Sequence, residues 1–268
     1  MEEKNEYQLH LKDIHLSFGG IKALHGVTTG VKKGEIFSII GPNGAGKTCL
    51  LNCINRFYQP DRGEIIFEGQ DITNLKPHRI ASLGIARTFQ NVELFGHMNV
   101  LDNIKLGAHV HLKSGSFSGG IYYGKTRAEE MALRKDIEER IVDLLEIEPI
   151  RKHVVHSLPY GLQKRVEMAR ALAMRPRVLL LDEPATGMNL EETEDIARFI
   201  LDINEEWGIT IILIEHDMGV VMDISDRICV LDFGQKIAEG KPKEIRHNEK
   251  VIKAYLGEED ITYSRLGA

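Results

Sequence analysis

The sequence predicts an α/β fold built around a parallel β-sheet. Three short, predominantly apolar runs support this prediction, and they span residues 36–40, 178–181 and 210–214. Strands that are buried on both faces of a parallel sheet show such nearly continuous apolar runs. Each run is followed by a glycine-rich or polar segment, and open α/β sheets bind ligands at the carboxyl ends of their strands. These observations place a candidate site at one edge of the sheet.

The first apolar run is followed by a complete phosphate-binding loop. Glycines let consecutive backbone N–H groups face a phosphate, and the helix that follows directs the positive end of its dipole to the same anion. The motif predicts that Lys47 reaches the β- and γ-phosphates and that the Thr48 hydroxyl holds Mg²⁺. A glycine-rich turn that only joins a strand to a helix is the weaker alternative. The predicted nucleotide-binding residues are Gly41, Pro42, Asn43, Gly44, Ala45, Gly46, Lys47, Thr48 and Cys49, and a helix is expected over 49–57.

The second and third apolar runs end in residues suited to phosphoryl transfer. The second run is followed by Asp182 and Glu183, and the third by Glu215, His216 and Asp217. We expect Asp182 to orient Mg²⁺ through its water shell and Glu183, which points the other way, to accept a proton from the attacking water. His216 is expected to sense or stabilise the γ-phosphate. A solvated acidic loop and a structural histidine are the alternatives.

With three further segments, the chain resembles the ATP-binding subunit of an ABC transporter. Residues 87–91 (Arg-Thr-Phe-Gln-Asn) are similar to the glutamine loop of that family, residues 157–172 to its signature segment and helix, and residues 187–189 to its D-loop. The resemblance implies a P-loop NTPase (RecA-like) core with an antiparallel β subdomain and an inserted α-helical subdomain. It implies a single ABC ATPase domain over 1–268, with a nucleotide-binding core at 1–90 and 175–235, a helical subdomain at 91–174 and a C-terminal extension at 236–268.

The resemblance also implies roles for residues outside the phosphate loop. Gln90 would contact Mg²⁺ or the attacking water, act in catalysis and report the nucleotide state to a membrane partner. Phe18 would stack on adenine, and a place in the core is its alternative. Asn189 would belong to the D-loop. The apolar pair Leu94 and Phe95 is expected either in a permease-facing groove or in the core.

The signature segment departs from the usual Leu-Ser-Gly-Gly-Gln pattern of the family. The resemblance implies that Leu158, Tyr160 and Gly161 complete the ATP site of a second copy, so that two nucleotides lie between two protomers. Pro159 replaces the serine and lacks both the hydroxyl and the backbone N–H. The contact must then come from Gly161, from its neighbours and from the dipole of a helix expected to begin near Leu162.

Within the family, the chain most resembles the ATPases of branched-chain amino-acid uptake. The similar segments are residues 87–91, the Leu-x-Tyr-Gly form of the signature, and residues 214–218, 225–228 and 251–258. The resemblance implies hydrolysis of ATP, with Mg²⁺, to power import of branched-chain or other hydrophobic amino acids. The implied partners are transmembrane permease subunits, a second ABC ATPase subunit and, indirectly, an extracytoplasmic solute-binding protein. An exporter ATPase of the lipopolysaccharide type, a soluble non-transport ABC protein and a non-catalytic subunit are the alternatives.

Composition agrees with a subunit that has no membrane span of its own. The 268 residues are 43% hydrophobic and 28% charged, no apolar run approaches the ~18 residues that a span needs, and the N-terminus lacks a signal-peptide core. We therefore expect a peripheral protein on the cytoplasmic face of the inner membrane. A net charge of −6 argues against nucleic acid as a partner. The basic cluster Lys164, Arg165 and Arg170 is interpreted as a solvated helix face.

Three segments are predicted from local pattern alone. The glycine- and serine-rich residues 113–120 are expected to form an exposed insertion, and residues 126–146 a charged helix. Residues 235–240 are expected to form a last strand and turn, and residues 242–256 one terminal helix. The three cysteines are too few for a disulfide framework, and Cys49 and Cys53 are expected to pack rather than bind metal.

Overall fold

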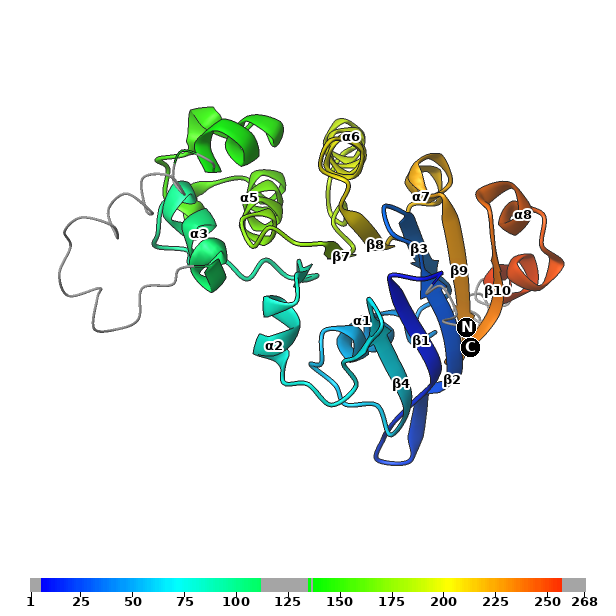
Figure 1. The fold of residues 1–268 in the computed structure, drawn as a ribbon. Helices are drawn as coiled ribbons and strands as arrows, with labels where there is room; N and C mark the ends of the chain where they lie inside the picture. The colour runs from blue at the N-terminus through cyan, green and yellow to red at the C-terminus, as the bar shows by residue number, and fades with distance from the viewer. Residues whose placement is uncertain (1–5, 112–134, 136, 257–268) are drawn as a thin grey trace.

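The computed structural model describes residues 6–111, 135 and 137–256. Within them the chain forms two β-sheets and a layer of helices (Figure 1). The insertion expected at 113–120, most of the first half of the helix expected at 126–146 and the C-terminal tail lie outside the described residues. The mixed α/β architecture with an antiparallel sheet and a helical part confirms the predicted fold class.

The smaller sheet is antiparallel and has the strand order β2-β1-β4-β5. Its strands are β1 (Leu9–Phe18), β2 (Ile21–Val31), β4 (Arg62–Phe67) and β5 (Gln70–Asp71). The apolar alternation of β1 is imperfect because the pairing register shifts between Leu11 and Ile14, where Asp13 has a φ of +51°. Such a bulge inserts an extra residue and restores the inward direction of the next apolar side chain.

The larger sheet has the order β10-β9-β3-β8-β7-β6, and all its pairs are parallel except β9 with β10. The strands are β3 (Ile36–Ile40), β6 (Ile85–Arg87), β7 (Val178–Asp182), β8 (Thr210–Ile214), β9 (Arg227–Asp232) and β10 (Gln235–Gly240). The carboxyl ends of β3, β8, β7 and β6 therefore lie along one edge, in that order. This edge carries the phosphate loop and the predicted catalytic residues.

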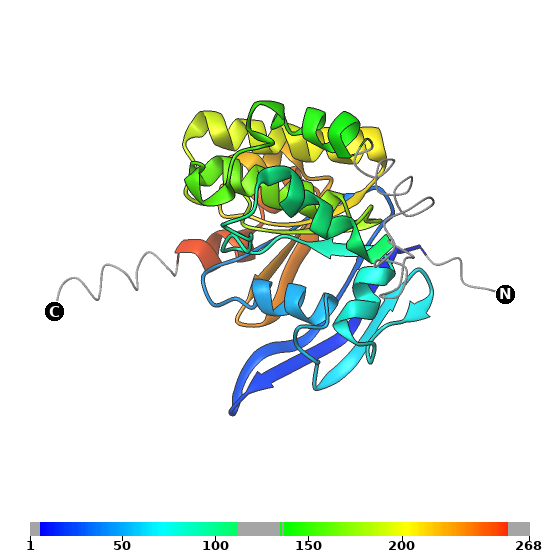
Figure 2. The same ribbon diagram turned by 90° about the vertical axis from the view of Figure 1, so that its left-hand side faces the viewer.

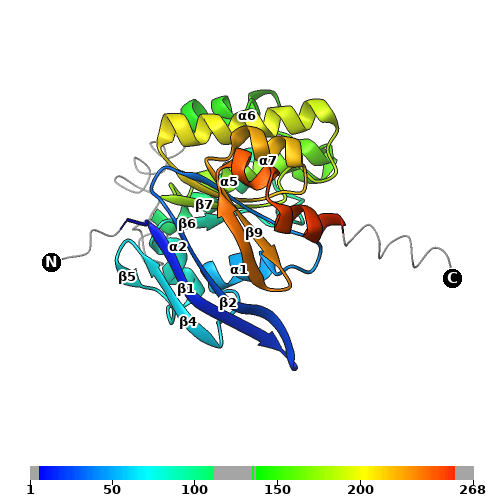
Figure 3. The same ribbon diagram turned by 90° about the vertical axis from the view of Figure 1, so that its right-hand side faces the viewer.

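Helices cover both faces of the larger sheet, as Figure 3 shows with α6 and α7 on one side of β9 and α1 on the other. On the first side lie α5 (Tyr160–Leu172), α6 (Leu190–Trp207) and α7 (Met218–Ile224). Alternate residues of a strand point to opposite faces. Accordingly, Leu179 and Leu181 pack with α5 and α6, whereas Leu180 packs with α1 (Lys47–Ile54) and the smaller sheet.

The remaining helical segments lie mainly between the glutamine loop and α5. Figure 2 shows the green and yellow helices on one side of the molecule and the blue hairpin of β1 and β2 on the other. The segments are α2 (Pro77–Ser82), α3 (Val100–Gly107), η1 (Ala108–His111), the π-helical η2 (Ile137–Val142), η3 (Glu148–Ile150) and η4 (Val155–Ser157). Residues of α3, η2 and α5 share one apolar core, which includes Ile104, Ile141 and Val166.

Three of the expected helices have different bounds in the structure. Helix α1 covers Lys47–Ile54 rather than 49–57, and Gly46 takes a left-handed conformation directly before its first residue. Helix α5 begins at Tyr160 rather than near Leu162, because extended Pro159 serves as its N-cap residue. The expected terminal helix is divided into α8 (Pro242–Arg246) and a second helical segment over 249–256. Asn248 separates them, since its side chain accepts from the backbone N–H of Lys250 at 3.0 Å.

Candidate nucleotide-binding site

The phosphate loop joins β3 to α1 in a backbone geometry that requires glycine. Gly41 has a φ of +148°, and a Cβ at this position would lie 2.0 Å from the carbonyl oxygen of Leu231. Lys47 is buried, and its Nζ donates to the carbonyl oxygens of Gly41 at 2.7 Å and Pro42 at 3.0 Å. The lysine thus lies across the loop that precedes it, with its ammonium group beside the place where the motif predicts phosphates.

A cavity of 290 Å³ opens above this loop. It brings together the loop, which follows β3, and the predicted catalytic residues that follow β6, β7 and β8. The sheet order explains this convergence, because these four strands are consecutive neighbours. The lining residues are Ala23, Asn43, Gly44, Ala45, Gly46, Lys47, Thr48, Cys49, Gln90, Glu183 and His216.

Glu183 is the centre of a hydrogen-bonded network at the cavity. Its Oε2 accepts from the side-chain amide of Gln90 at 2.9 Å, and its Oε1 lies 2.9 Å from Nε2 of His216. Its backbone has a φ of +52°, which is uncommon for a residue other than glycine, and its N–H donates to the carbonyl oxygen of Ile214. Such strain is held only where the surroundings determine the conformation. The arrangement aims a nearly buried carboxylate into the cavity between an amide and an imidazole.

Asp182 is fully buried beneath the cavity and is paired with Arg87. The guanidinium of Arg87 donates to Oδ2 of Asp182 at 2.7 Å and also to the side-chain oxygen of Asn52 on α1. Burial raises the pKa of the Asp182 carboxyl, and the Arg87 guanidinium opposes this rise. The pairing of Arg87 with Asp182 was not anticipated, although a polar side chain at the end of a neighbouring buried strand is a signal that could have identified it.

The donor set fits Mg²⁺. Asp182 Oδ1 is buried and has no hydrogen-bond partner, and the Thr48 hydroxyl and the Gln90 amide supply further oxygens at the cavity. Mg²⁺ prefers oxygen ligands and is usually held by one or two protein groups together with substrate phosphates and water. Among the described residues, no three or more histidine, cysteine, aspartate or glutamate side chains are grouped so that they could hold a metal ion by themselves.

Glu215 is a further buried acid, and its carboxylate joins two loops of the site. Its carboxylate accepts from the backbone N–H groups of Ala185 at 2.7 Å and His216 at 2.9 Å. Burial raises its pKa, although these hydrogen bonds act in the opposite direction. Glu215 therefore joins the loop after β7 to the loop after β8. The sequence shows this residue between a buried strand and His216, but its bonds to the other loop depend on the fold.

Comparison with known proteins identifies the family. Residues 24–186 match the family described as ABC transporter, and residues 235–261 match the family described as branched-chain amino acid ATP-binding cassette transporter. The chain belongs to the ABC transporter family. As a member of this ATPase family it binds and hydrolyses ATP, which confirms the predicted enzyme class.

Three similar proteins illustrate the match to ABC transporters. The high-affinity branched-chain amino acid transport ATP-binding protein BraF of Pseudomonas aeruginosa is 43% identical, over 93% of this chain and 98% of its own length. The ADP conformation of the ATP-binding cassette MJ1267 has a TM-score of 0.80 at 34% identity, with 93% of this chain and 98% of that chain covered. The dimeric post-hydrolysis structure of the cassette MJ0796, bound to ADP and phosphate, has a TM-score of 0.74 at 28% identity, with 87% and 98% covered.

Two aromatic residues singled out from the sequence, Phe18 and Phe95, are exposed. The Phe18 side chain is 44% exposed, so the alternative that placed it in the core is wrong. It meets the ring of Tyr58 edge-on, with 5.0 Å between ring centroids, and it does not line the 290 Å³ cavity. Phe95 is also exposed, whereas its neighbour Leu94 packs against the core around α3 and α5. The expected apolar pair is thus divided between surface and core.

The signature segment and the D-loop lie side by side at the N-termini of α5 and α6. Leu158 is buried and Tyr160 is 42% exposed. A Cβ on Gly161 would lie 2.6 Å from Oε1 of Glu192. Asn189 is the N-cap of α6, and it exchanges two hydrogen bonds with Glu192, at 3.0 and 3.1 Å. In this chain, therefore, the D-loop asparagine has a local capping role.

The basic cluster on α5 is not a solvated helix face, contrary to the expectation from sequence. Lys164 is only 4% exposed, and its Nζ donates to the carbonyl oxygens of Phe89 at 2.9 Å and Gln90 at 2.7 Å. Arg170 donates to the carbonyl oxygen of Glu93. The interpretation was wrong because the glutamine loop, which is distant in sequence, covers the side chain of Lys164.

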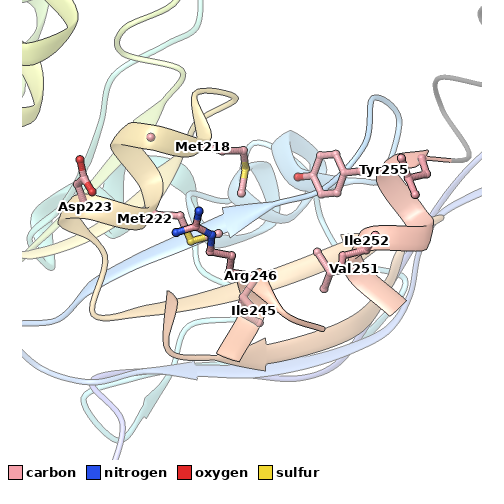
Figure 4. A pocket seen from close by; sticks show the side chains of 10 residues that line it. Met218, Met222, Asp223, Ile245, Arg246, Val251, Ile252 and Tyr255 are labelled. Carbon is pink, nitrogen blue, oxygen red and sulfur yellow. The ribbon is translucent and has the colours of Figure 1, made fainter. Parts of the chain in front are cut away.

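A second, larger pocket of 600 Å³ lies between α7 and the C-terminal helices (Figure 4). Met218 and Met222 of α7 line it together with Ile245, Val251 and Tyr255. None of the predicted nucleotide-site residues lines this pocket, although α7 begins two residues after His216.

Among the helices of the described ranges, none is long and apolar enough to cross a membrane.

Proposed function

We propose that this ABC ATPase powers the uptake of branched-chain or other hydrophobic amino acids across a cell membrane. The observation that carries the proposal is its 43% identity to BraF over nearly the full length of both chains. The separate match of residues 235–261 to a branched-chain amino acid transporter family supports it, because this segment lies outside the nucleotide site.

Within the site, we assign hydrolysis to Glu183, Gln90 and His216. Glu183 is the general base that takes a proton from the attacking water, and its carboxylate is held in place by the other two side chains. Lys47 and the backbone N–H groups of the loop bind the β- and γ-phosphates, and Phe18 stacks on adenine. His216 would contact the γ-phosphate once its ring turns away from Glu183.

Mg²⁺ is the assigned metal, and when bound it neutralises charge that develops on the phosphate oxygens. Thr48 and Gln90 are its proposed direct ligands, and Asp182 orients its water shell through Oδ1. Arg87 holds the other carboxylate oxygen of Asp182, which leaves Oδ1 without a hydrogen-bond partner.

The working unit that we propose contains two ATPase subunits. Leu158, Tyr160 and Gly161 of one protomer would face the nucleotide of the other, and Asn189 would lie at the interface between them. The exposure of Tyr160 and the dimeric structure of the similar cassette MJ0796 support this arrangement. The second subunit is either an identical copy or a related ATPase.

The proposed membrane partners are transmembrane permease subunits, with a solute-binding protein on the other side. The chain would sit as a peripheral subunit on the cytoplasmic face, with residues 1–90 and 175–235 as its nucleotide-binding core, 91–174 as its helical subdomain and 236–268 as its C-terminal extension. Exposed Phe95, beside the glutamine loop, is a proposed point of contact with the permease.

The proposal is tested by isolating the native complex with a Glu183→Gln subunit and identifying its partners by mass spectrometry. Recovery of permeases with this subunit, and ATP-dependent uptake of labelled leucine in proteoliposomes that contain the same complex with the wild-type subunit, are the expected results. A Lys47→Ala subunit is the control and should assemble without driving uptake. Recovery of lipopolysaccharide-export components, or of soluble partners alone, would overturn the uptake assignment.

A further inference from the structure

The glutamine loop leaves the sheet after Arg87 and continues to residue 93. Over residues 88–93 it is bonded chiefly to α5 rather than to the sheet that it follows. The backbone N–H of its first residue, Thr88, donates to the carbonyl oxygen of Leu180 on β7 at 2.9 Å. Beyond that point the backbone of the loop is held by side chains of α5. Irregular backbone in a partly buried position must find such partners for its N–H and C=O groups.

Lys164 and Glu167 supply these partners in a complementary way. Lys164 donates to the carbonyl oxygens of Phe89 and Gln90. Glu167 accepts, through its Oε1, from the backbone N–H of Phe89 at 3.3 Å and of Glu93 at 3.4 Å. The two side chains lie three residues apart and therefore on one face of the helix.

Both charged groups are buried and face each other. Lys164 is 4% exposed and Glu167 is 1% exposed, and 3.8 Å separates Lys164 Nζ from Glu167 Oε2. Burial lowers the pKa of Lys164 and raises that of Glu167. A buried ion pair is weak evidence for stability, because desolvation offsets its attraction. Charge-assisted bonds to backbone, however, define the position of a segment well.

Gln90 is consequently held from two sides. Its backbone carbonyl is bound by Lys164 of α5, and its side-chain amide is bound by Glu183 at the end of β7. A displacement of α5 relative to the sheet must break one of these two bonds or carry Gln90 along. The same helix carries the signature residues Tyr160 and Gly161 at its N-terminus.

We propose that Lys164 and Glu167 form a clamp that makes the glutamine loop move with the signature helix, so that engagement of the signature segment repositions Gln90 against Glu183. Both are positioning residues, since neither lines the nucleotide cavity. The inference rests on the proposed role of Gln90 in hydrolysis. It is independent of the transported solute.

The first test measures hydrogen exchange of the amides in residues 88–93 of the full-length chain. Lys164→Met and Glu167→Met should accelerate exchange at Phe89 and Glu93 by about tenfold or more, as expected when charge-assisted bonds are lost. Arg165→Met is the matched control, because Arg165 lies on the same helix but pairs with Asp195 and Glu146 instead of the loop. Unchanged exchange in both clamp variants would overturn the inference.

The second test measures steady-state ATP turnover of the same variants, at protein concentrations at which the wild-type chain is active. The clamp variants should lose about tenfold in kcat while KM for ATP changes little, because the phosphate loop is untouched. Glu167→Gln, which keeps the acceptor oxygen, should retain more activity than Glu167→Met.

Gln90→Ala separates this inference from the proposed function on which it rests. If Gln90→Ala leaves kcat unchanged, the proposed role of Gln90 is wrong, and the functional part of the inference falls with it. If Gln90→Ala lowers kcat but release of the loop in the clamp variants does not, the inference alone is overturned.

Discussion

The side-chain amide of Gln90 donates a hydrogen bond of 2.9 Å to the carboxylate of Glu183, across 93 residues of sequence. The two residues meet because β6 and β7 are parallel neighbours whose carboxyl ends lie at the same edge. His216, which follows the next strand, approaches the second carboxylate oxygen. The position of one carboxylate thus depends on three strand ends, and substitutions at each strand end should have distinguishable effects.

Glu183→Gln should reduce ATP turnover by about 10²–10⁴-fold, because an amide cannot accept the proton of the attacking water. ATP binding should persist, since Lys47 and the phosphate loop are unchanged. Phosphate release and equilibrium nucleotide binding measure the two effects separately. Glu205→Gln, on the exposed side of α6, is the control and should retain full turnover. Full turnover in Glu183→Gln would mean that another group is the base.

Phe18→Ala should weaken ATP binding by roughly fivefold to tenfold, which corresponds to the loss of an aromatic stacking contact. Affinity for inorganic triphosphate, which has no base, should not change. Titration of both ligands checks the difference. Phe57→Ala is a matched control, because Phe57 packs on the same Tyr58 ring at 5.6 Å. Equal losses for both ligands would show that Phe18 acts on the phosphate loop and not on adenine.

Arg87→Met should lower the free energy of unfolding by about 3–5 kcal/mol, because it leaves the buried Asp182 carboxylate without its partner. Urea denaturation measures this loss. Arg62→Met removes the exposed pair with Asp13 and should have a much smaller effect, since solvent screens such pairs. If the two variants unfold alike, the buried pair does not contribute to stability beyond a surface pair.

Glu215→Gln should become more stable relative to the wild-type chain as pH rises. Burial raises the pKa of Glu215 in the folded state, so the folded protein binds more protons than the unfolded one between the ordinary and the raised pKa. Wild-type stability therefore falls as pH increases through this window, and glutamine, which does not titrate, escapes that loss. Chemical denaturation from pH 4 upward compares the two proteins. A difference that shrinks with rising pH would contradict the prediction.

The local sequence pattern was sufficient to predict a strand wherever neighbouring residues in the chain share one environment. The strands at 36–40, 178–181, 210–214 and 235–240 were predicted because both faces of the inner strands are buried and the last strand follows a turn. Helix ends were predicted less well. The left-handed Gly46, the extended Pro159 and the cap at Asn248 are single-residue conformations that helical periodicity does not encode.

By itself, the sequence determined the fold class, the phosphate loop and the residues at the strand ends, because these depend on short motifs and on apolar runs. Tertiary structure alone decided which of these residues meet. The bond of Gln90 to Glu183 and the pairing of Arg87 with Asp182 follow from strand order. Lys164, interpreted as solvated from its own helix, is buried by a loop 75 residues away. Burial and charge pairing depend on contacts between distant segments, and helical periodicity carries no information about such contacts.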